Sequence, residues 1–426
     1  PKKKESFAFT VNQAVDYRRK LLWAFEEAWR TIRDRYYDPR CNNRDWSAIR
    51  EKYGAAAPSC FGRREFSDLV NLMLGELNGS HHGFYPRGAG HPALSGWSPP
   101  RSSWRPTTWH LGVVWDRERE GAGLAVKEVV PHSPAAKEKS RLNAGDVVLT
   151  VNGEPVDAAT DTTRIFNLPE RKPFLLEVEN PEGEKRELEI LPVTYRKIRY
   201  LVRDDTLERR RERVDKLSGG RLGYLHVAAM NNSSFREFQE DLYAAGYGRK
   251  GMIVDVRNNG GGSTADRLLT ALCQPRHAVT IPRNGKPGYP RHRIVYARWN
   301  RPIVVLCNQS SYSNAEIFSH AIKTLGRGEL VGVTTAGGVI STGGAAVLDM
   351  GYMRLPRRGW FLLESGEDME LNGARPHHIV WPEPEEDAHV DRDRQLAKAV
   401  EVLLARVEKE GSPFPEVRYA ADRPRE

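Results

Sequence analysis

The sequence predicts an α+β multidomain protein: an N-terminal helical domain, a β-rich domain, and an α/β domain with a mostly parallel sheet. Three observations support this prediction. The chain has 426 residues, which exceeds one ordinary domain. Apolar residues follow helical spacing near the N-terminus, and strands alternate with helices in the second half. The predicted domains span residues 1–98, 99–198 and 199–426.

The first ~95 residues are expected to be helical. The stretch DYRRKLLWAFEEAWRTIRDRYY places apolar residues near i, i+3 and i+4 spacing, which is typical of an amphipathic helix. The residues of this stripe are Leu21, Phe25, Ala28, Trp29, Ile32 and Tyr36. A second helix is expected at residues 64–76. Residues 87–106 are rich in Gly, Pro and Ser, which marks a domain boundary.

Residues 107–195 contain short β-type runs separated by turn residues, with a short helix expected at SPAAKEK. The order of HLGVV and AGDVVLTVNGEPV in this segment resembles a PDZ domain. The resemblance implies that an extended chain end adds as a strand to a sheet edge. The backbone amides around Leu111 and Gly112 would then hold a carboxylate. A role in packing or in gating a cleft is the alternative.

The third domain alternates strands and helices. The strands are expected at RLGYLHVAAM, GMIVDVRNN, RPIVVLCNQ and ELVGVTT, with helices at 234–245 and 264–273 and from the SYSN turn onward. This order implies βαβ units and a mostly parallel sheet, where ligands bind beyond the carboxyl ends of the strands. Two loops, NNGGG and SYSN, lie at such ends and open onto helix N-termini, which favour an oxyanion.

Composition and charge favour a soluble globular protein, with 39% hydrophobic and 28% charged residues and a net charge of +9. The densest basic cluster, residues 203–216, is interleaved with acids and indicates a solvated helix or linker. A nucleic-acid-binding protein is the weaker interpretation, since no such motif accompanies the charge. No run reaches the ~18 apolar residues of a membrane span. The start, PKKKESFAF, indicates a trimmed or mature form, so the compartment stays open between cytoplasm and periplasm.

No cofactor or metal site is predicted. The four cysteines form no C-x-x-C, and the histidines form no H-E-x-x-H. Cys273 and Cys307 lie in apolar runs and are expected to be buried, and pairing of Cys41 with Cys60 stays open. The glycine triplet fits neither nucleotide-binding motif.

A glycine-rich loop and a serine-rich turn stand at the ends of two predicted strands. The first reads DVRNNGGG over residues 255–262, and about fifty residues later the second reads SYSNAEIF. The combination resembles the tail-specific and C-terminal-processing serine peptidases, in which a serine just before a helix is the nucleophile. The α/β-hydrolase motif G-x-S-x-G is absent around these serines.

This resemblance implies roles for individual residues. Ser313 corresponds to the nucleophile, and the oxyanion hole is the amide of Asn314 with that of Gly261 or Gly262. Local sequence alone favours a helix N-cap at Ser313, because serine is an ordinary N-cap residue. The upstream glycine loop reverses that preference.

Two schemes for activating the serine exist in this broad family. One uses a lysine that follows the serine, but no lysine lies between residues 324 and 397. The other belongs to tricorn-type core proteases, with a Ser-His pair in a helical domain and a glutamate near the C-terminus. LGELNGSHHGFYP offers Ser80 and His81, and EDMELNGARPHHIV offers Glu370. The resemblance implies that His81 is the base, oriented by Ser80 and Glu370.

His82 is the alternative base, because neighbouring side chains do not both point into one site. An unperturbed histidine titrates near pH ~6.5. An adjacent carboxylate favours the charged imidazole. The apparent pKa of the base is therefore expected at or above that value.

The resemblance to tricorn core proteases runs from AFEEAWRTIRDRYYDP to DRDRQLAKAVEVLL. It implies a serine peptidase acting on oligopeptides or unfolded polypeptides through an acyl-enzyme, in a homo-oligomer. Asn314 departs from the usual aspartate, and residues 273–284 offer no acid to receive a basic substrate side chain. The β-propellers of full tricorn are missing, which indicates a fragment or a shorter relative. The alternative function is an inactive PDZ-bearing scaffold or peptide-binding protein of the same fold.

Overall fold

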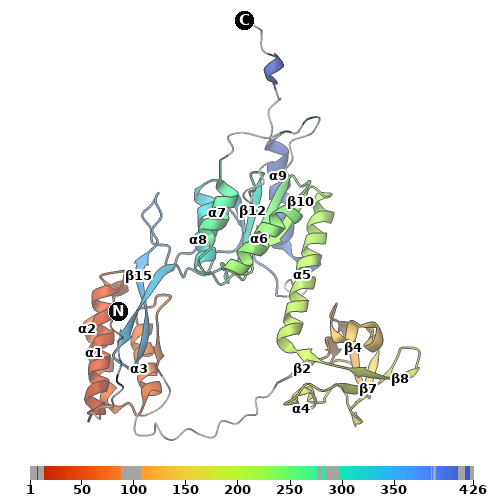
Figure 1. The fold of residues 1–426 in the computed structure, drawn as a ribbon, viewed down its shortest axis with the longest axis horizontal. Coiled ribbons are helices and arrows are strands. Elements are labelled where there is room, and N and C mark those ends of the chain that lie inside the picture. The colour runs from red at the N-terminus through yellow and green to blue at the C-terminus, as the bar shows by residue number, and fades with distance from the viewer. Residues whose placement is uncertain are drawn as a thin grey trace. The chain divides into compact units, whose positions relative to one another are not determined.

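The structure is a computed structural model, shown in Figure 1. It describes residues 7, 14–87, 107–275, 281, 283, 298–384, 386, 390–410 and 418–422. The chain divides into two compact units. The first comprises Pro1–Ser98, Leu217–Pro384 and Asp393–Glu426, and the second comprises Pro99–Lys216 and Glu385–Arg392.

The N-terminal part of the first unit contains the expected helices. They are α1 (Tyr17–Arg35), α2 (Trp46–Gly54) and α3 (Arg63–Gly75), with single turns at η1 (Cys41–Asn43) and η2 (Ala57–Ser59). The predicted apolar stripe of α1 is buried throughout, from Leu21 to Tyr36. Each large apolar side chain buried in this way contributes roughly 1.5–3 kcal/mol. The amphipathic pattern therefore holds α1 against α2 and α3.

The expectation that the whole N-terminal region is helical is wrong at β1 (Gly83–Pro86). This strand pairs antiparallel with β15 (Gly351–Gly359), which pairs with β14 (Ile340–Val347). Glycine and proline disfavour a helix here, and the pairing partner lies far along the chain. One face of this sheet packs into the core of α1 and α3, as Figure 1 shows for β15 beside α1.

The α/β part of the first unit confirms the predicted parallel sheet. Its strands, in spatial order, are β10 (Leu222–His226), β11 (Gly251–Asp255), β12 (Ile303–Cys307), β13 (Glu329–Gly332) and β16 (His378–Ile379). The helices are α6 (Asn232–Ala244), α7 (Ala265–Cys273), α8 (Asn314–Thr324) and α9 (Arg394–Glu410). β11 and β12 are buried at every residue, as expected for central parallel strands. The two-residue β16 was not predicted.

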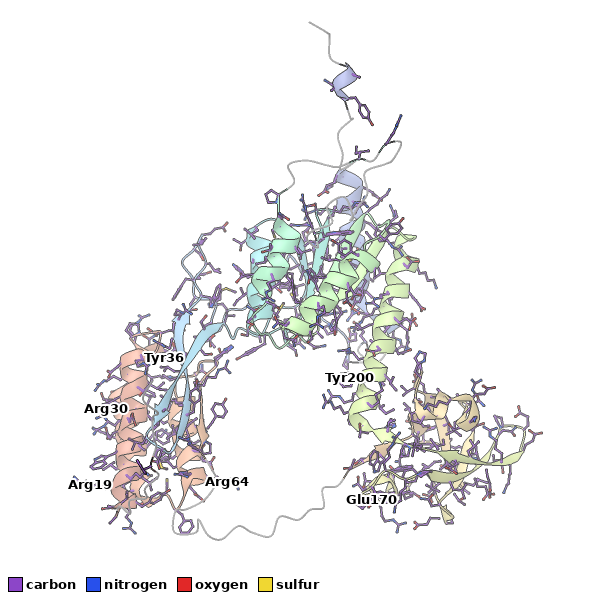
Figure 2. All side chains as sticks on the ribbon, viewed as in Figure 1. Arg19, Arg30, Tyr36, Arg64, Glu170 and Tyr200 are labelled. Carbon is purple, nitrogen blue, oxygen red and sulfur yellow. The ribbon has the colours of Figure 1, made fainter. Side chains whose placement is uncertain are left out.

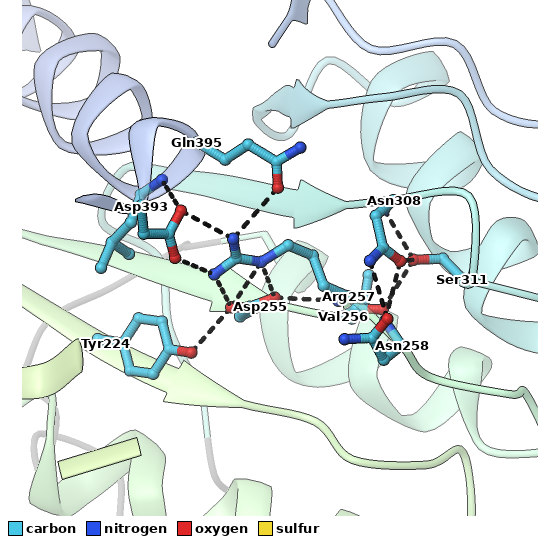
Figure 3. A network of polar contacts seen from close by, with 10 residues as sticks. Tyr224, Asp255, Val256, Arg257, Asn258, Asn308, Ser311, Asp393 and Gln395 are labelled. Carbon is cyan, nitrogen blue, oxygen red and sulfur yellow. Dashed lines mark hydrogen bonds and ion pairs between the residues drawn. The ribbon is translucent and has the colours of Figure 1, made fainter. Parts of the chain in front are cut away.

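A buried ionic network fixes the carboxyl end of β11 to the start of α9 (Figure 3). The guanidinium of Arg257 lies 2.7 Å from Asp255 and 2.9 Å from Asp393. It also donates to Gln395, and the Tyr224 hydroxyl donates to Asp255. Removing one partner of such a cluster leaves an uncompensated buried charge. The network therefore anchors the strand end from which the glycine loop departs.

The second unit is built on an antiparallel sheet. Its strands are β3 (Val113–Asp116), β4 (Leu124–Val129), β5 (Val147–Val151), β7 (Phe174–Glu179) and β8 (Lys185–Ile190) in that order, with β6 (Glu154–Pro155) beside β5. β2 (Trp109–His110) and β9 (Val193–Thr194) pair as a separate two-stranded antiparallel sheet. This unit also contains a five-residue helix, α4 (Thr162–Phe166), which was not predicted. SPAAKEK forms two 3-10 turns, η4 (Pro134–Ala136) and η5 (Glu138–Ser140), in place of the expected short helix.

Basic residues are distributed over several elements. The cluster at 203–216 lies within α5 (Tyr195–Ser218), a 24-residue helix. Figure 2 marks Arg19 and Arg30 on α1 and Arg64 on α3. Remaining short turns are η6 (Val390–Arg392) and η7 (Ala420–Asp422). Among the described residues, no helix has both the length and the apolar character needed to cross a membrane.

The four cysteines are free thiols. Cys307 is buried, as predicted, and Cys273 is only half-buried because it ends α7. Cys41 is buried and Cys60 half-buried, and no bond joins them. The structure therefore shows no disulfide between the two helical-region cysteines.

We expect Arg257→Met to lower the free energy of unfolding by about 3–5 kcal/mol, because Asp255 and Asp393 would be left without their countercharge. Urea unfolding followed by tryptophan fluorescence measures the change. Arg164→Met is the matched control, since Arg164 pairs with Glu154 at the surface and should contribute at most ~1 kcal/mol. Equal effects of the two substitutions would contradict an anchoring role for Arg257.

Candidate active site

Three distant segments of the first unit bring four of the predicted site residues together. Ser80 and His81 lie in the turn between α3 and β1, Ser313 precedes α8, and Glu370 follows β15. The Ser313 Oγ atom lies 3.0 Å from His81 Nε2. His81 Nδ1 lies 2.5 Å from Ser80 Oγ, which lies 3.0 Å from Glu370 Oε2. The four side chains form one continuous hydrogen-bonded relay.

The relay defines which imidazole nitrogen carries the proton. Glu370 accepts the Ser80 hydroxyl and also the backbone N–H groups of Ser80 and Val339, at 2.5 and 2.7 Å. Ser80 Oγ is thereby left to accept the Nδ1–H of His81. The Nε2 lone pair is then free to accept the hydroxyl proton of Ser313. His81 rather than His82 is the histidine in reach of Ser313.

Ser313 occupies a strained backbone position between β12 and α8. Its φ of 58° and ψ of −118° are rare for a residue with a side chain, and such a conformation costs about 1–3 kcal/mol. A sharp strand-to-helix turn of this kind exposes a nucleophile in enzymes that carry G-x-S-x-G. The turn forms here without that motif. Backbone strain at a residue already in the relay supports a functional role over simple capping.

The fully buried Glu316 holds this turn in place, and it was not identified from the sequence. Its carboxylate accepts the backbone N–H of Ser313 at 2.9 Å. It also accepts the amides of Gly337 and Gly338 and the Thr335 hydroxyl, at 2.5, 2.9 and 2.6 Å. Glutamate three residues after a helix N-cap is the capping-box position, so the spacing in the sequence could have indicated it.

Tyr312 is a second residue that sequence reasoning missed. Its ring stacks on the His81 imidazole, with centroids 4.9 Å apart and planes 8° from parallel. Its hydroxyl oxygen lies 3.1 Å from His81 Nδ1. The contact restricts rotation of the imidazole and covers one of its faces. The only sequence signal is the position of the tyrosine directly before Ser313.

The predicted oxyanion residues lie beside Ser313. A Cβ atom added to Gly261 would come 2.7 Å from Ser313 Cβ and 3.0 Å from the Asn314 nitrogen, so only glycine permits this approach. The Gly261 N–H already donates to Asn259 Oδ1 at 2.9 Å. A substrate oxygen would therefore compete with that side chain for this amide. Gly262 is the next residue of the same loop.

Asn314 contributes its side chain to the loop geometry. Its Oδ1 accepts the backbone N–H of Ala265, at 2.8 Å, and so joins the start of α8 to the start of α7. The interaction uses only an acceptor oxygen, which asparagine and aspartate both provide. Replacement of the aspartate that is usual in tricorn therefore leaves this contact possible.

The expectation that the pKa of the base lies at or above ~6.5 is wrong for His81. Burial, then the positive charge of Arg354 and the neighbouring His82, lower the pKa of His81 to about 4. The Glu370 carboxylate does not touch the imidazole, because the Ser80 hydroxyl stands between them. Desolvation of the charged form therefore outweighs the carboxylate.

The predicted carboxylate-binding loop of the second unit, Leu111 and Gly112, lies between β2 and β3. The Gly112 N–H donates to His110 Nδ1 at 2.9 Å, so a side chain of the chain itself already occupies this amide. A cavity of about 130 Å³ adjoins the loop. It is lined from β3 and α4 by Val113, Trp115, Thr162, Thr163 and Phe166, and beside β2 by Thr108, Trp109, His110 and Leu111.

Three family models match the chain. Residues 221–380 match peptidase family S41, residues 20–75 match the tricorn protease C1 domain, and residues 105–168 match the PDZ domain. Tricorn protease homolog 1 of Streptomyces coelicolor is 30% identical over 419 residues, which are 95% of this chain and 37% of that protein. The carboxyl-terminal-processing protease of Synechocystis is 25% identical over 353 residues, covering 78% of this chain and 72% of that protein.

The fold has a solved counterpart. The crystal structure of the tricorn protease superposes with a TM-score of 0.73 at 24% identity, over 92% of this chain and 37% of that chain. The likeness shows that the two chains share a fold. Segments similar to the tricorn C1 domain, the PDZ domain and peptidase family S41 follow one another along this chain, which confirms the predicted resemblance to tricorn-type serine peptidases. The chain spans little more than a third of the length of the Streptomyces coelicolor relative, at 37%.

In the described part of the chain, no group of three or more His, Cys, Asp or Glu side chains is arranged to hold a metal ion.

We expect peptide cleavage to stay constant between about pH 6 and 8 and to fall as the pH drops through about 4. The base must be neutral to accept a proton, and a lowered pKa keeps it neutral above that value. The measurement is kcat/KM against pH, with activity at pH 7 recorded after each acid exposure to exclude unfolding. A midpoint at or above ~6.5 would show that the buried environment does not control His81.

Proposed function

We propose that this chain is a serine peptidase that hydrolyses peptide bonds of oligopeptides or unfolded polypeptides through an acyl-enzyme. The observation that carries the proposal is the Ser313–His81 contact, 3.0 Å from Oγ to Nε2, at a strained serine beside a glycine loop. The site lies at the carboxyl ends of β11 and β12, where parallel sheets bind ligands.

In the first half of the reaction, His81 Nε2 takes the hydroxyl proton as Ser313 Oγ attacks the substrate carbonyl. Negative charge develops on the carbonyl oxygen beside the amides of Asn314 and Gly261 or Gly262. One such donor is worth a factor of about 10²–10³ in rate. His81 then gives the proton to the leaving amine, and an acyl-enzyme remains.

In the second half, His81 takes a proton from water as the water oxygen attacks the acyl carbonyl. The proton then returns to Ser313 Oγ, and the carboxylic acid product leaves. Throughout, Ser80 accepts the Nδ1–H of the imidazolium, and Glu370 accepts the Ser80 hydroxyl. The two residues orient the ring and offset its charge, and neither transfers a proton to the substrate.

The proposal includes peptide binding by the PDZ-like domain and assembly of the chain into a homo-oligomer. In the described part of the chain β3 is an end strand of its sheet, and the cavity beside α4 suits an extended peptide added along it, with the Leu111–Gly112 loop at the end of that peptide. Similarity to tricorn-type proteases also motivates a homo-oligomer. In this proposal the chain has three functional domains. Residues 1–98 form the helical domain that carries Ser80 and His81, residues 99–198 form the PDZ-like domain, and residues 199–426 form the α/β catalytic domain.

An inactive scaffold of the same fold is the alternative. It would keep peptide binding in the second unit and require no reactive serine. The continuous relay from Glu370 to Ser313 favours the enzyme, because a scaffold has no use for four aligned polar side chains. Labelling by a serine-reactive fluorophosphonate separates the two functions.

We expect Ser313→Ala to abolish peptide cleavage and fluorophosphonate labelling, because the nucleophilic oxygen is lost. The backbone conformation at residue 313 is held by Glu316, so circular dichroism and the unfolding midpoint should change little. Ser310→Ala is the control, since Ser310 lies in the same turn outside the relay. Substantial cleavage by Ser313→Ala would reduce Ser313 to a helix cap.

We expect His81→Ala to lower kcat by about 10²–10⁴-fold, the usual contribution of a general base. Glu370→Gln should lower kcat by less, because it orients the base through Ser80. His82→Ala should leave kcat nearly unchanged. The three variants are compared on one fluorogenic peptide at pH 7. An inactive His82→Ala beside an active His81→Ala would reverse the assignment of the base.

A further inference from the structure

The backbone of the Leu111–Gly112 loop is fixed by contacts within the second unit. The Leu111 carbonyl accepts the N–H of Ala135 at 2.9 Å, and the Gly112 carbonyl accepts the N–H of Val130 at 2.8 Å. Gly112 has a φ of 94°. A Cβ atom added there would come 2.1 Å from the side chain of Ser133, which is fully buried. The loop therefore cannot rotate its peptide groups toward a new partner without breaking these contacts.

The Gly112 amide already has a hydrogen-bond partner. Its N–H donates to His110 Nδ1 at 2.9 Å. A ring nitrogen of histidine accepts a hydrogen bond only when it carries no proton, so His110 is neutral while this bond exists. Burial also lowers the pKa of His110, because it disfavours the charged imidazole. A carboxylate oxygen that arrived at the loop would have to displace His110 from this amide.

The cavity beside the loop offers a carboxylate no positive charge. Of the described residues that line it, none is lysine or arginine. Arg117 contacts Thr162 of α4, but its guanidinium also donates to the carbonyls of Ala158 and Thr160, both at 2.9 Å. A carboxylate that leaves water without a countercharge or hydrogen-bond donors is strongly disfavoured.

The cavity instead suits one apolar side chain. Its walls include three aromatic and two aliphatic side chains, those of Trp109, Trp115, Phe166, Leu111 and Val113. Its volume is about 130 Å³, and an apolar cavity of roughly 150 Å³ holds a benzene-sized group. The indole N–H of Trp109 donates to the Leu168 carbonyl at 3.0 Å, which fixes the wall at β2 to the chain after α4.

The strand β3 borders this cavity, since Val113 and Trp115 belong to both. In the described part of the chain β3 is an end strand of its sheet. An end strand presents unpaired backbone N–H and C=O groups to a further strand. Pairing of this kind uses only the peptide backbone, so it is possible at any point along an extended polypeptide. Binding along β3 therefore does not require a chain end.

We propose that the PDZ-like domain binds an internal stretch of extended polypeptide, with one apolar side chain in the cavity, and that His110 closes the loop to a free terminal carboxylate. The inference rests on the proposed peptide binding by this domain and specifies its ligand. The bound segment ends at the loop, and the polypeptide continues beyond it. An unfolded chain offers many such segments, whereas it has one C-terminus.

The test measures binding of four short peptides that carry a fluorophore at the N-terminus and consist otherwise of serine, threonine and glycine. The first peptide ends in leucine with a free carboxylate, and the second is the same peptide with a C-terminal amide. The third carries the leucine in its middle and ends in an amide. The fourth is the third with serine in place of leucine. The protein is the full chain with Ser313→Ala, so that no peptide is cleaved, and fluorescence anisotropy gives each Kd.

Three further substitutions are added to that chain one at a time. His110→Ala removes the acceptor that occupies the Gly112 amide. Thr163→Trp fills the cavity from α4, because Thr163 lines it. His132→Ala is the matched control, since His132 is an exposed histidine of the same unit outside the cavity lining. The unfolding midpoint of each variant shows whether its fold is intact.

We expect the Ser313→Ala chain to bind the first three peptides with Kd values within about threefold of one another. The fourth peptide should bind about 10- to 100-fold more weakly, because it lacks the side chain that the cavity buries. His110→Ala should acquire a preference of about 10-fold for the first peptide over the second, since the freed amide can now donate to a carboxylate. Thr163→Trp should lose binding of all peptides, and His132→Ala should match its parent.

Three results would overturn the inference. One is a preference of 10-fold or more for the first peptide over the second in the Ser313→Ala chain, which would identify a binder of free C-termini. Another is a folded His110→Ala variant that gains no such preference, which would show that His110 does not close the loop. The third is unchanged binding by a folded Thr163→Trp variant, which would place the peptide elsewhere. Absence of binding by all four peptides would instead overturn the proposed peptide binding itself, while fluorophosphonate labelling of the wild-type chain tests the peptidase chemistry separately.

Discussion

The site depends on the loop at residues 335–339, which two buried carboxylates, Glu316 and Glu370, hold by hydrogen bonds. Glu316, at the start of α8, accepts four hydrogen bonds, three of them from this loop. Glu370 accepts the N–H of Val339. A buried carboxylate is tolerated only when its oxygens are satisfied, so the two groups fix the loop and the loop fixes them. The positions of Ser313 and Glu370, the two ends of the relay, are thereby fixed relative to each other.

Close packing around this loop leaves room for few side chains. A Cβ atom on Gly338 would lie 2.1 Å from the Tyr312 ring, and one on Gly261 would meet Ser313. Only glycine therefore fits at positions 261 and 338, on either side of the turn at Ser313. Behind it, the Arg257 network holds the end of β11 against α9. The strain at Ser313 persists because these surrounding contacts leave the turn no alternative conformation.

Electrostatics at the base are set by burial more than by the carboxylate of the relay. The Ser80 hydroxyl lies between the Glu370 carboxylate and the imidazole, so the negative charge of Glu370 makes no direct contact with His81. Arg354 acts in the opposite direction. The lowered pKa keeps His81 neutral above about pH 4, and the hydrogen bonds of Ser80 and Glu370 are placed to stabilise its protonated form.

The sequence by itself determined the elements whose cause is local or periodic. The α1 stripe, the parallel strands and the two loops at their ends follow from apolar spacing and strand–helix alternation, and the family motifs singled out Ser313, His81, Ser80 and Glu370. Only the tertiary structure decided what depends on contacts between distant segments. These are the pairing of β1 with β15, the stacking of Tyr312, the four bonds of Glu316 and the position of Arg354. The sign of the His81 pKa shift belongs with them, because desolvation and neighbouring charge are properties of the folded surroundings and not of the residue.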